Sequence, residues 1–109
     1  MSHATINSDD SALEARVIEQ IKKVYDPEIP LDVLELGLIY NVEIQDKAVS
    51  VLMTLTNPGC PSGAAIVQTV ERAISDIDEV KGVEVELTFD PPYTFDMMSE
   101  AGKLELGFL

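Results

Sequence analysis

The sequence predicts an α+β fold, a two-layer αββαβ sandwich in which a small three-stranded mixed sheet carries its helices on one face. Apolar residues alternate with polar ones in three stretches and recur at helical spacing in two others. One helical stretch lies between the second and third strands, and a helix in that place makes neighbouring strands parallel. A short turn joins the first two strands, which we therefore expect to be antiparallel. Helices that share one face of such a sheet form the second layer.

A first helix is predicted from Ser11 to the Asp26-Pro27 dipeptide. Ser11 and Glu14 have the spacing of a capping box, and the residue before a proline avoids helical dihedrals. The apolar stripe of this helix consists of Leu13, Val17, Ile21 and Val24. Residues 26–37 are too apolar for a flexible linker and too rich in proline for a long element. We expect an ordered loop there, with one helical turn at 32–36 that Gly37 closes.

The three strands are predicted at residues 38–45, 48–56 and 83–89, with a hairpin turn at Asp46-Lys47. The second helix follows the second strand, and its apolar stripe consists of Ile66, Val70, Ile74 and Ile77. Asp90-Pro91-Pro92-Tyr93 turns the chain away from the sheet. Residues 95–106 are expected to form a short, imperfect helix that Gly102 weakens.

Length and charge limit the classes of function. The 109 residues predict one domain at 11–109 after a flexible tail at 1–10. Twenty acidic residues against seven basic ones give a formal charge of −13, which argues against nucleic acid and anionic membranes as partners. One cysteine excludes an internal disulfide. The first ten residues lack the basic and apolar segments of a signal peptide, so we expect a cytoplasmic protein without membrane contact.

The only cysteine lies in Thr56-Asn57-Pro58-Gly59-Cys60-Pro61-Ser62-Gly63, between the second strand and the second helix. The prolines and glycines fit a tight turn, which would place Cys60 at or just before a helix N-terminus. Unpaired N–H groups and the helix dipole favour a thiolate there, and a thiolate is both a nucleophile and a ligand for soft metals. The alternative is a buried cysteine that acts as a small hydrophobic residue. The turn-forming neighbours favour the functional interpretation.

Three segments carry a family resemblance. They are Asp26-Pro27-Glu28-Ile29-Pro30 with Leu36-Gly37-Leu38-Ile39, then Met53-Thr54-Leu55-Thr56 leading to Pro58-Gly59-Cys60-Pro61, and finally Asp90-Pro91-Pro92-Tyr93. In content and order they resemble the SufT/PaaD-like iron-sulfur assembly family, which also includes a eukaryotic cytosolic iron-sulfur targeting subunit. The resemblance extends over residues 17–106. The family more often has tryptophan where this chain has Tyr93, a mild departure because both rings are flat and carry a polar group.

The resemblance implies a domain similar to the C-terminal scaffold domain of NifU and a non-enzymatic role in assembling, carrying or delivering iron-sulfur clusters. It places the family's cysteine at Cys60, as the exchangeable ligand, and the family's acidic residues at Asp26 and Glu28. Turn formation and helix termination are the alternative roles for these two carboxylates. We expect the motif residues to build a shallow pocket beside Cys60, namely Asp26, Pro27, Glu28, Thr56, Pro58, Gly59, Pro61, Asp90, Pro91, Pro92 and Tyr93.

One thiolate cannot hold a cluster alone, because iron-sulfur clusters generally take four soft ligands. The cluster is therefore expected to be transient, shared between two chains of a homodimer or with a recipient or scaffold protein. Met97 and Met98 are candidate soft ligands, but packing is the more common role of methionine. Two alternatives remain open. One is a non-catalytic PaaD-like subunit of a multicomponent oxygenase, and the other is a thiol-based redox protein.

Overall fold

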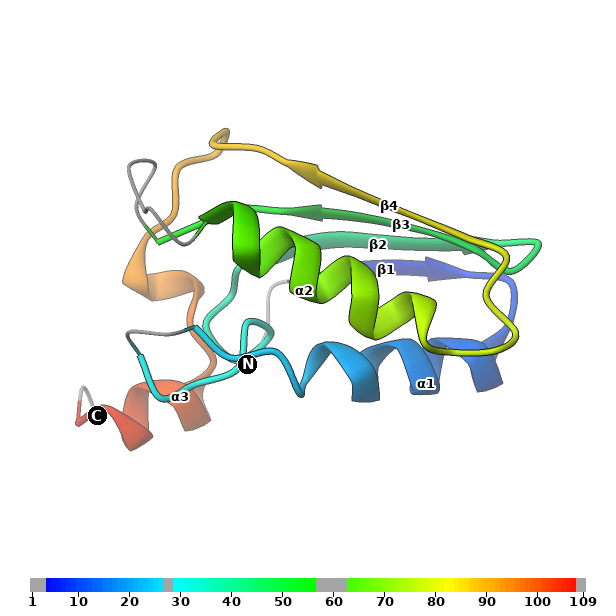
Figure 1. Ribbon diagram of the computed structural model, residues 1–109. Coiled ribbons are helices and arrows are strands. Elements are labelled where there is room, and N and C mark those ends of the chain that lie inside the picture. The colour runs from blue at the N-terminus through cyan, green and yellow to red at the C-terminus, as the bar shows by residue number, and fades with distance from the viewer. Residues whose placement is uncertain (1–3, 27–28, 57–62, 108–109) are drawn as a thin grey trace.

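The protein forms two layers, a four-stranded sheet and two helices that both cover one face of it (Figure 1). The computed structural model describes residues 4–26, 29–56 and 63–107. In chain order the elements are β1 (Thr5–Ser8), α1 (Ser11–Ile21), β2 (Ile39–Gln45), β3 (Ala48–Met53), α2 (Gly63–Ser75), β4 (Gly82–Leu87), a 3-10 helix (Phe95–Met97) and α3 (Glu100–Glu105).

The strand order is β1-β2-β3-β4. β2 and β3 pair antiparallel through the turn at Asp46 and Lys47, whose positive φ angles of 51° and 65° are those of a two-residue hairpin turn. β3 and β4 pair parallel, and α2 connects them. These pairings and the α+β class confirm the prediction. The number of strands does not, because β1 pairs parallel with β2 and adds a fourth strand.

β1 corrects the prediction of a flexible tail, since Thr5–Ser8 form a strand inside the predicted 1–10 segment. Ile6 packs against the hydrophobic core, and Asp9 accepts a hydrogen bond from the backbone N–H of Asp46 in the hairpin turn at 3.0 Å. The strand has four residues, too few for an alternating pattern to be recognised in the sequence. Its partner lies more than thirty residues further along the chain.

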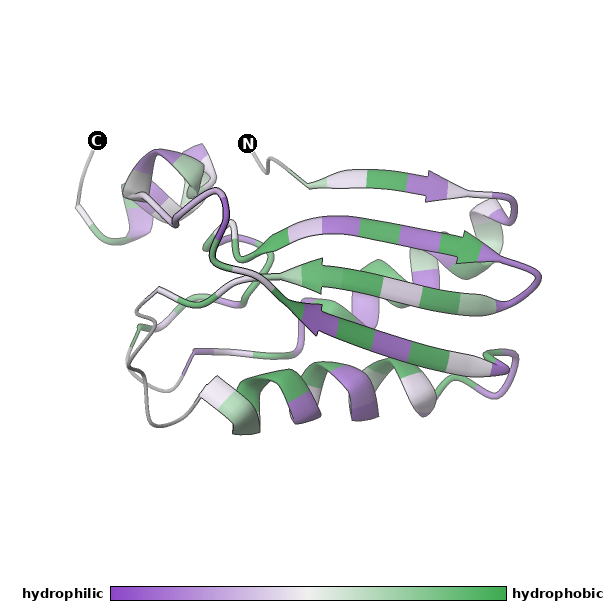
Figure 2. Cartoon of the chain, turned by 90° about the horizontal axis from the view of Figure 1, so that it is seen from above, coloured by the Kyte–Doolittle hydropathy of each residue, from purple (hydrophilic) through white to green (hydrophobic). Residues whose placement is uncertain are grey.

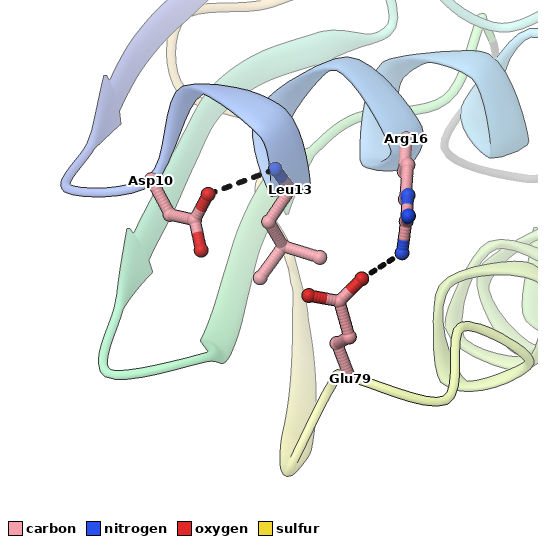
Figure 3. Close-up of polar contacts among 4 residues, drawn as sticks. All are labelled: Asp10, Leu13, Arg16 and Glu79. Atoms are coloured by element: carbon pink, nitrogen blue, oxygen red, sulfur yellow. Dashed lines mark hydrogen bonds and ion pairs between the residues drawn. The ribbon is translucent and has the colours of Figure 1, made fainter.

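The helices bury the stripes that the sequence predicts, although the limits of α1 differ. Asp10, not Ser11, is the N-cap residue, and its carboxylate accepts from the N–H of Leu13 at 3.1 Å (Figure 3). α1 ends at Ile21, several residues before the predicted limit at Asp26-Pro27. The Val24 carbonyl is already outside the helix and accepts a hydrogen bond from the N–H of Val33 at 2.8 Å. Buried residues on both helices contribute to the core, namely Leu13, Val17, Ile21, Ile66, Val70 and Ile74.

Two polar contacts join the outer elements. Gln20 on α1 donates from Nε2 to the Ala73 carbonyl of α2 at 2.7 Å. Arg16 on α1 forms an ion pair with Glu79, in the connection between α2 and β4 (Figure 3). These contacts hold α1 against α2 and against the connection that follows α2.

The sheet face away from the helices is open (Figure 2). Side chains on β2 and β3 alternate between a buried face, with Val42, Val49 and Val51, and an outer face, with Glu43 and Ser50. This is the pattern of a sheet with one face on the core. None of the helices in the described ranges is long and apolar enough to cross a membrane.

The C-terminal segment is not one helix over 95–106. The 3-10 turn Phe95–Met97 and α3 are separated at Ser99, whose N–H donates to the Glu35 carbonyl at 2.8 Å. The Ser99 hydroxyl caps α3 by accepting from the N–H of Gly102 at 2.9 Å, and it also hydrogen-bonds the Glu35 carboxylate. The chain direction therefore changes where this serine docks on the loop after α1.

Candidate functional site

Segments from three distant parts of the sequence meet at residues 36–38. The Tyr93 hydroxyl donates to the Leu36 carbonyl at 2.6 Å, and the N–H of Thr54 donates to the Leu38 carbonyl at 2.8 Å. The N–H of Thr88 donates to the Met53 carbonyl at 2.8 Å, which joins the chain after β4 to the end of β3. Described residues of all three motif segments are thus in contact at one end of the sheet (Figure 1).

Gly37 allows this close approach. Its φ of +82° lies in the left-handed region, and it ends the predicted helical turn, in which the N–H of Leu36 donates to the Asp32 carbonyl at 3.0 Å. A Cβ atom at Gly37 would lie 2.1 Å from the Met97 carbonyl oxygen. No side chain fits there, so the loop after α1 and the C-terminal segment touch through their backbones.

The cysteine connection is described at its two flanks. Thr56 is half-buried and follows Leu55, which is buried, and Gly63 begins α2. A Cβ atom at Gly63 would lie 2.4 Å from Leu55 Cδ1, so the end of β3 and the start of α2 are in contact. The other predicted residues of this motif and of the acidic loop lie outside the described residues, namely Pro27, Glu28, Pro58, Gly59, Cys60 and Pro61. Their roles remain predictions.

Asp26 is buried, with 7% of its surface exposed. Its carboxylate accepts from the N–H of Ile29 at 3.2 Å, and its N–H donates to the Leu31 carbonyl at 3.3 Å. These are the turn hydrogen bonds that the alternative interpretation of this carboxylate predicts. Asp26 therefore shapes its own loop.

Asp32 has the corresponding role in the following turn. Its Oδ1 accepts from the backbone N–H groups of Leu34 and Glu35, each at 3.0 Å. Burial raises the pKa of the Asp32 carboxyl above its usual value, because the loss of water outweighs the two amide donors. The nearby Glu35 carboxylate acts in the same direction.

Tyr93 joins the last motif to the first through the Leu36 carbonyl. Burial, together with smaller contributions from the nearby Tyr40 and Asp26, raises the pKa of its hydroxyl to about 12. The phenol is therefore protonated at neutral pH and acts as the donor to Leu36.

Asp90 and Pro91 line a cavity of about 720 Å³ on the open side of the sheet. Tyr40, Leu52 and Met97 also line it, whereas Asp26, Pro92 and Tyr93 do not. Of the predicted pocket residues that the structure describes, only Asp90 and Pro91 line this cavity, and the pocket beside Cys60 stays a prediction. Tyr93 faces the loop after α1, while Asp90 and Pro91 face the outer side of the sheet.

Metal-ligating groups are sparse in the described part of the chain. It contains no group of three or more histidine, cysteine, aspartate or glutamate residues that could hold a metal ion. Met98 is buried in the core, as predicted for a packing residue. Met97 is half-buried, and its sulfur accepts a hydrogen bond from the Tyr40 hydroxyl at 3.4 Å.

Sequence reasoning missed Tyr40 and Ser99. The Tyr40 hydroxyl donates to the Pro91 carbonyl at 2.8 Å, across 51 residues of sequence. Its place in an alternating strand gives no indication of this partner. Ser99 precedes an acidic residue and a short apolar run, which is a weak N-cap pattern. The prediction of one continuous helix over residues 95–106 overlooks it.

The chain is similar to known proteins of one family. Residues 14–87 match the family described as iron-sulfur cluster assembly protein. Over 105 residues the chain is 46% identical to an Fe-S protein maturation auxiliary factor of Porphyromonas gingivalis, covering 95% of this chain and 100% of the relative. It is 44% identical over 85 residues to the Fe-S protein maturation auxiliary factor SufT of Staphylococcus aureus, covering 77% and 97% of the two chains.

A solved structure has the same fold. The crystal structure of a domain of unknown function from Bacillus anthracis superimposes with a TM-score of 0.83 at 32% identity, covering 91% of this chain and 95% of the other. The family match includes the connection that carries Cys60, and the fold match includes the C-terminal motif. The chain therefore belongs to the iron-sulfur cluster assembly protein family.

Proposed function

We propose that the protein is an accessory factor for iron-sulfur cluster assembly that carries or delivers clusters to recipient enzymes, with Cys60 as its exchangeable ligand. The family match carries this proposal, because it spans the cysteine connection and the chain covers the whole length of the P. gingivalis auxiliary factor. The protein acts as a carrier and not as an enzyme. Its single thiol and acidic surface suit a reducing cytoplasm.

The described flanks support a fixed base for the cysteine connection. The Leu55–Gly63 contact brings its two ends together, and Thr54 hydrogen-bonds the loop after α1 at 2.8 Å. A short connection on such a base would present its thiol at one end of the sheet. Because the turn precedes a helix, the dipole of α2 favours the thiolate that a cluster iron requires.

The chemistry is ligand exchange without a change of redox state. The Cys60 thiolate replaces one ligand of an incoming cluster, and a thiolate of the recipient later displaces Cys60. A chain with a single cysteine supplies one of the four usual ligands, so donor, recipient or a second copy of the chain supplies the others. A cluster held in this way is transient, as delivery requires.

Asp26 and Tyr93 position the loops in this proposal and do not bind iron. The Asp26 carboxylate is occupied by a backbone N–H of its own loop, and the protonated Tyr93 hydroxyl is held by the Leu36 carbonyl. A neutral phenol with a pKa of about 12 is a poor metal ligand at neutral pH. Removing either group would change the shape of the site and would leave its iron ligand in place.

Anaerobic cluster transfer tests the proposal. The protein is incubated with ferrous iron, sulfide and a small thiol, its absorbance is recorded, and reactivation of apo-aconitase is then followed. We expect the wild-type chain to accelerate reactivation and Cys60→Ser to lose this acceleration. Ser50→Ala, an equally small change at an exposed residue of β3 that keeps the thiol, is the matched control and should retain most of it.

Three results would contradict the proposal. If Cys60→Ser transfers clusters as well as the wild type does, the thiol is not the ligand. If Cys60 is alkylated rapidly at neutral pH and no cluster absorbance or transfer is detected, the thiol-based redox function is favoured. A slowly alkylated Cys60 without any cluster would favour the non-catalytic oxygenase subunit.

A further inference from the structure

The cavity on the open sheet face is separate from the loops around Tyr93. Its floor lies where Thr5, Asn41 and Leu52 form one row across β1, β2 and β3. Leu52 alternates with the buried Val51 and Met53, so its side chain is on the side away from the helices. Figure 2 looks onto this face. With about 720 Å³, the cavity has the size of a site for a small ligand or for a side chain and its neighbours.

Hydrogen bonds hold the walls of the cavity in place. The Tyr40 hydroxyl joins β2 both to the Pro91 carbonyl at 2.8 Å and to the Met97 sulfur at 3.4 Å. The N–H of Asp90 donates to the Thr88 hydroxyl at 3.2 Å, which fixes the turn after β4. A cavity with tethered walls does not have to be ordered on binding, which lowers the entropic cost of binding.

The lining combines apolar surface with negative charge. Leu52, Pro91 and Met97 supply apolar atoms, and Asp90 and Asp96 supply carboxylates. None of the seven lysine and arginine residues of the chain lines the cavity. Glu86 pairs with Leu52 in the next strand and extends the acidic surface along the same row. Charge complementarity therefore selects a cationic ligand with an apolar part.

We propose that this cavity is a docking site for a basic, apolar peptide segment of a partner protein, with an arginine or lysine beside an aliphatic or aromatic residue. The apolar floor takes the hydrophobic side chain and the long aliphatic stem of the cation, and the Asp90 carboxylate of the lining takes the positive charge. The proposal goes beyond the proposed function, because docking at this cavity needs neither Cys60 nor a cluster.

Peptide titration tests the docking site. The probe is a fluorescein-labelled synthetic peptide of alternating arginine and leucine residues flanked by glycine and serine. Two control peptides replace the arginines by glutamates or the leucines by serines. We expect saturable binding of the first peptide, measured by fluorescence anisotropy, and no binding of the glutamate peptide. The serine peptide should bind several-fold more weakly, because it retains only the charge contacts.

Two protein variants separate the cavity from general electrostatic attraction. Leu52→Lys places a cation on the cavity floor and should weaken binding about tenfold or more. Ser50→Lys makes the same change of charge on the same face of β3, two residues away and outside the cavity lining, and should bind like the wild type. Both positions face away from the core, and far-UV circular dichroism checks that both variants fold.

The amide chemical shifts of the chain locate the peptide. We expect changes at Asn41, Leu52 and Thr94 and none at Gln68 or Arg72 on α2. Equal losses in both lysine variants, binding of the glutamate peptide, shifts confined to α2, or no binding at all would each overturn the docking site. Cys60→Ser should bind the peptide normally, so a failure of cluster transfer would leave this result unaffected.

Discussion

Replacing Gly37 by alanine tests whether the loop after α1 and the C-terminal segment are held together through their backbones. A left-handed φ costs a residue with a Cβ atom about 1–2 kcal/mol. The new Cβ would also lie 2.1 Å from the oxygen and 2.6 Å from the carbon of the Met97 carbonyl, so the backbone itself has to move. Overpacking of this kind costs about 1–3 kcal/mol. We therefore expect Gly37→Ala to lower the free energy of unfolding by about 3 kcal/mol.

Two other glycines separate these contributions. Gly107 has a φ of +83° with nothing within 4 Å of its Cβ position, so Gly107→Ala carries only the conformational cost, about 1 kcal/mol. Gly82 has no neighbour within 4 Å and no positive φ, so Gly82→Ala should change stability by no more than about 0.5 kcal/mol. The three variants form a series in which only Gly37→Ala adds the contact with Met97.

Urea denaturation followed by far-UV circular dichroism measures this series, and the lack of tryptophan makes fluorescence a poor probe. For a domain of this size a loss of about 3 kcal/mol corresponds to a melting temperature lower by roughly 10–20 °C. If Gly37→Ala and Gly107→Ala lose the same amount, the contact with Met97 has no energetic weight. The account of how the motif segments are held together would then be wrong.

Three further predictions concern residues around the site. Asp32→Asn keeps the acceptor oxygen and removes a carboxylate whose pKa is raised, so the charge of Asp32 destabilises the fold once it ionises; in urea denaturation at pH 7 this variant should be at least as stable as the wild type. Asp32→Ala leaves two backbone amides without their acceptor and should lower the free energy of unfolding by about 1–2 kcal/mol. Because the pKa of Tyr93 is raised from 10.0 to about 12, its stabilising contribution is complete below pH 10 and is lost between pH 10 and 12. Over that range the free energy of unfolding of the wild type should fall by about 1–2 kcal/mol more than that of Tyr93→Phe. Parallel curves of stability against pH for the two proteins would refute the assignment. Gly63→Ala should cost about 1–2 kcal/mol because its Cβ meets Leu55 Cδ1 at 2.4 Å, and it should cost almost nothing in a Leu55→Ala background; additive losses in the double variant would exclude this contact.

Local patterns determined most of the fold. Alternation located β2 and β3 to within a few residues, because Val42, Val49 and Val51 point to a core on one face only. The helix stripes were equally readable, since they depend on spacing within one element. The parallel pairing of β3 and β4 then followed from chain connectivity.

The failures come from contacts between distant residues. The sequence predicts that α1 continues to the proline after Asp26. In the structure the helix has already ended at Val24, whose carbonyl accepts a hydrogen bond from the N–H of Val33. The C-terminal helix was predicted as one piece, but Ser99 docks on Glu35 and interrupts it. No local pattern encodes such partners, and a propensity-based prediction continues a helix until a strong breaker appears.

The membership of the candidate site remains a prediction, and the structure describes part of its geometry. The family resemblance selected Asp26, Asp90 and Tyr93, and the influence of Asp26 on the pKa of Tyr93 agrees with their proximity. Their division between two surfaces depends on Tyr40, which holds Pro91 on the outer side of the sheet. The orientation of a strand side chain toward a distant loop cannot be inferred from alternation alone.

The short first strand has a practical consequence for protein production. Without Thr5–Ser8, β2 would become the edge of the sheet, and the backbone groups of residues 41–44 that now pair with β1 would lose their partners. Exposed edges pair readily with other chains, which leads to aggregation. A shortened form that begins at the first helix would thus be prone to self-association. Expression designs should keep residues 4–10, and an affinity tag at this end needs a spacer before Thr5.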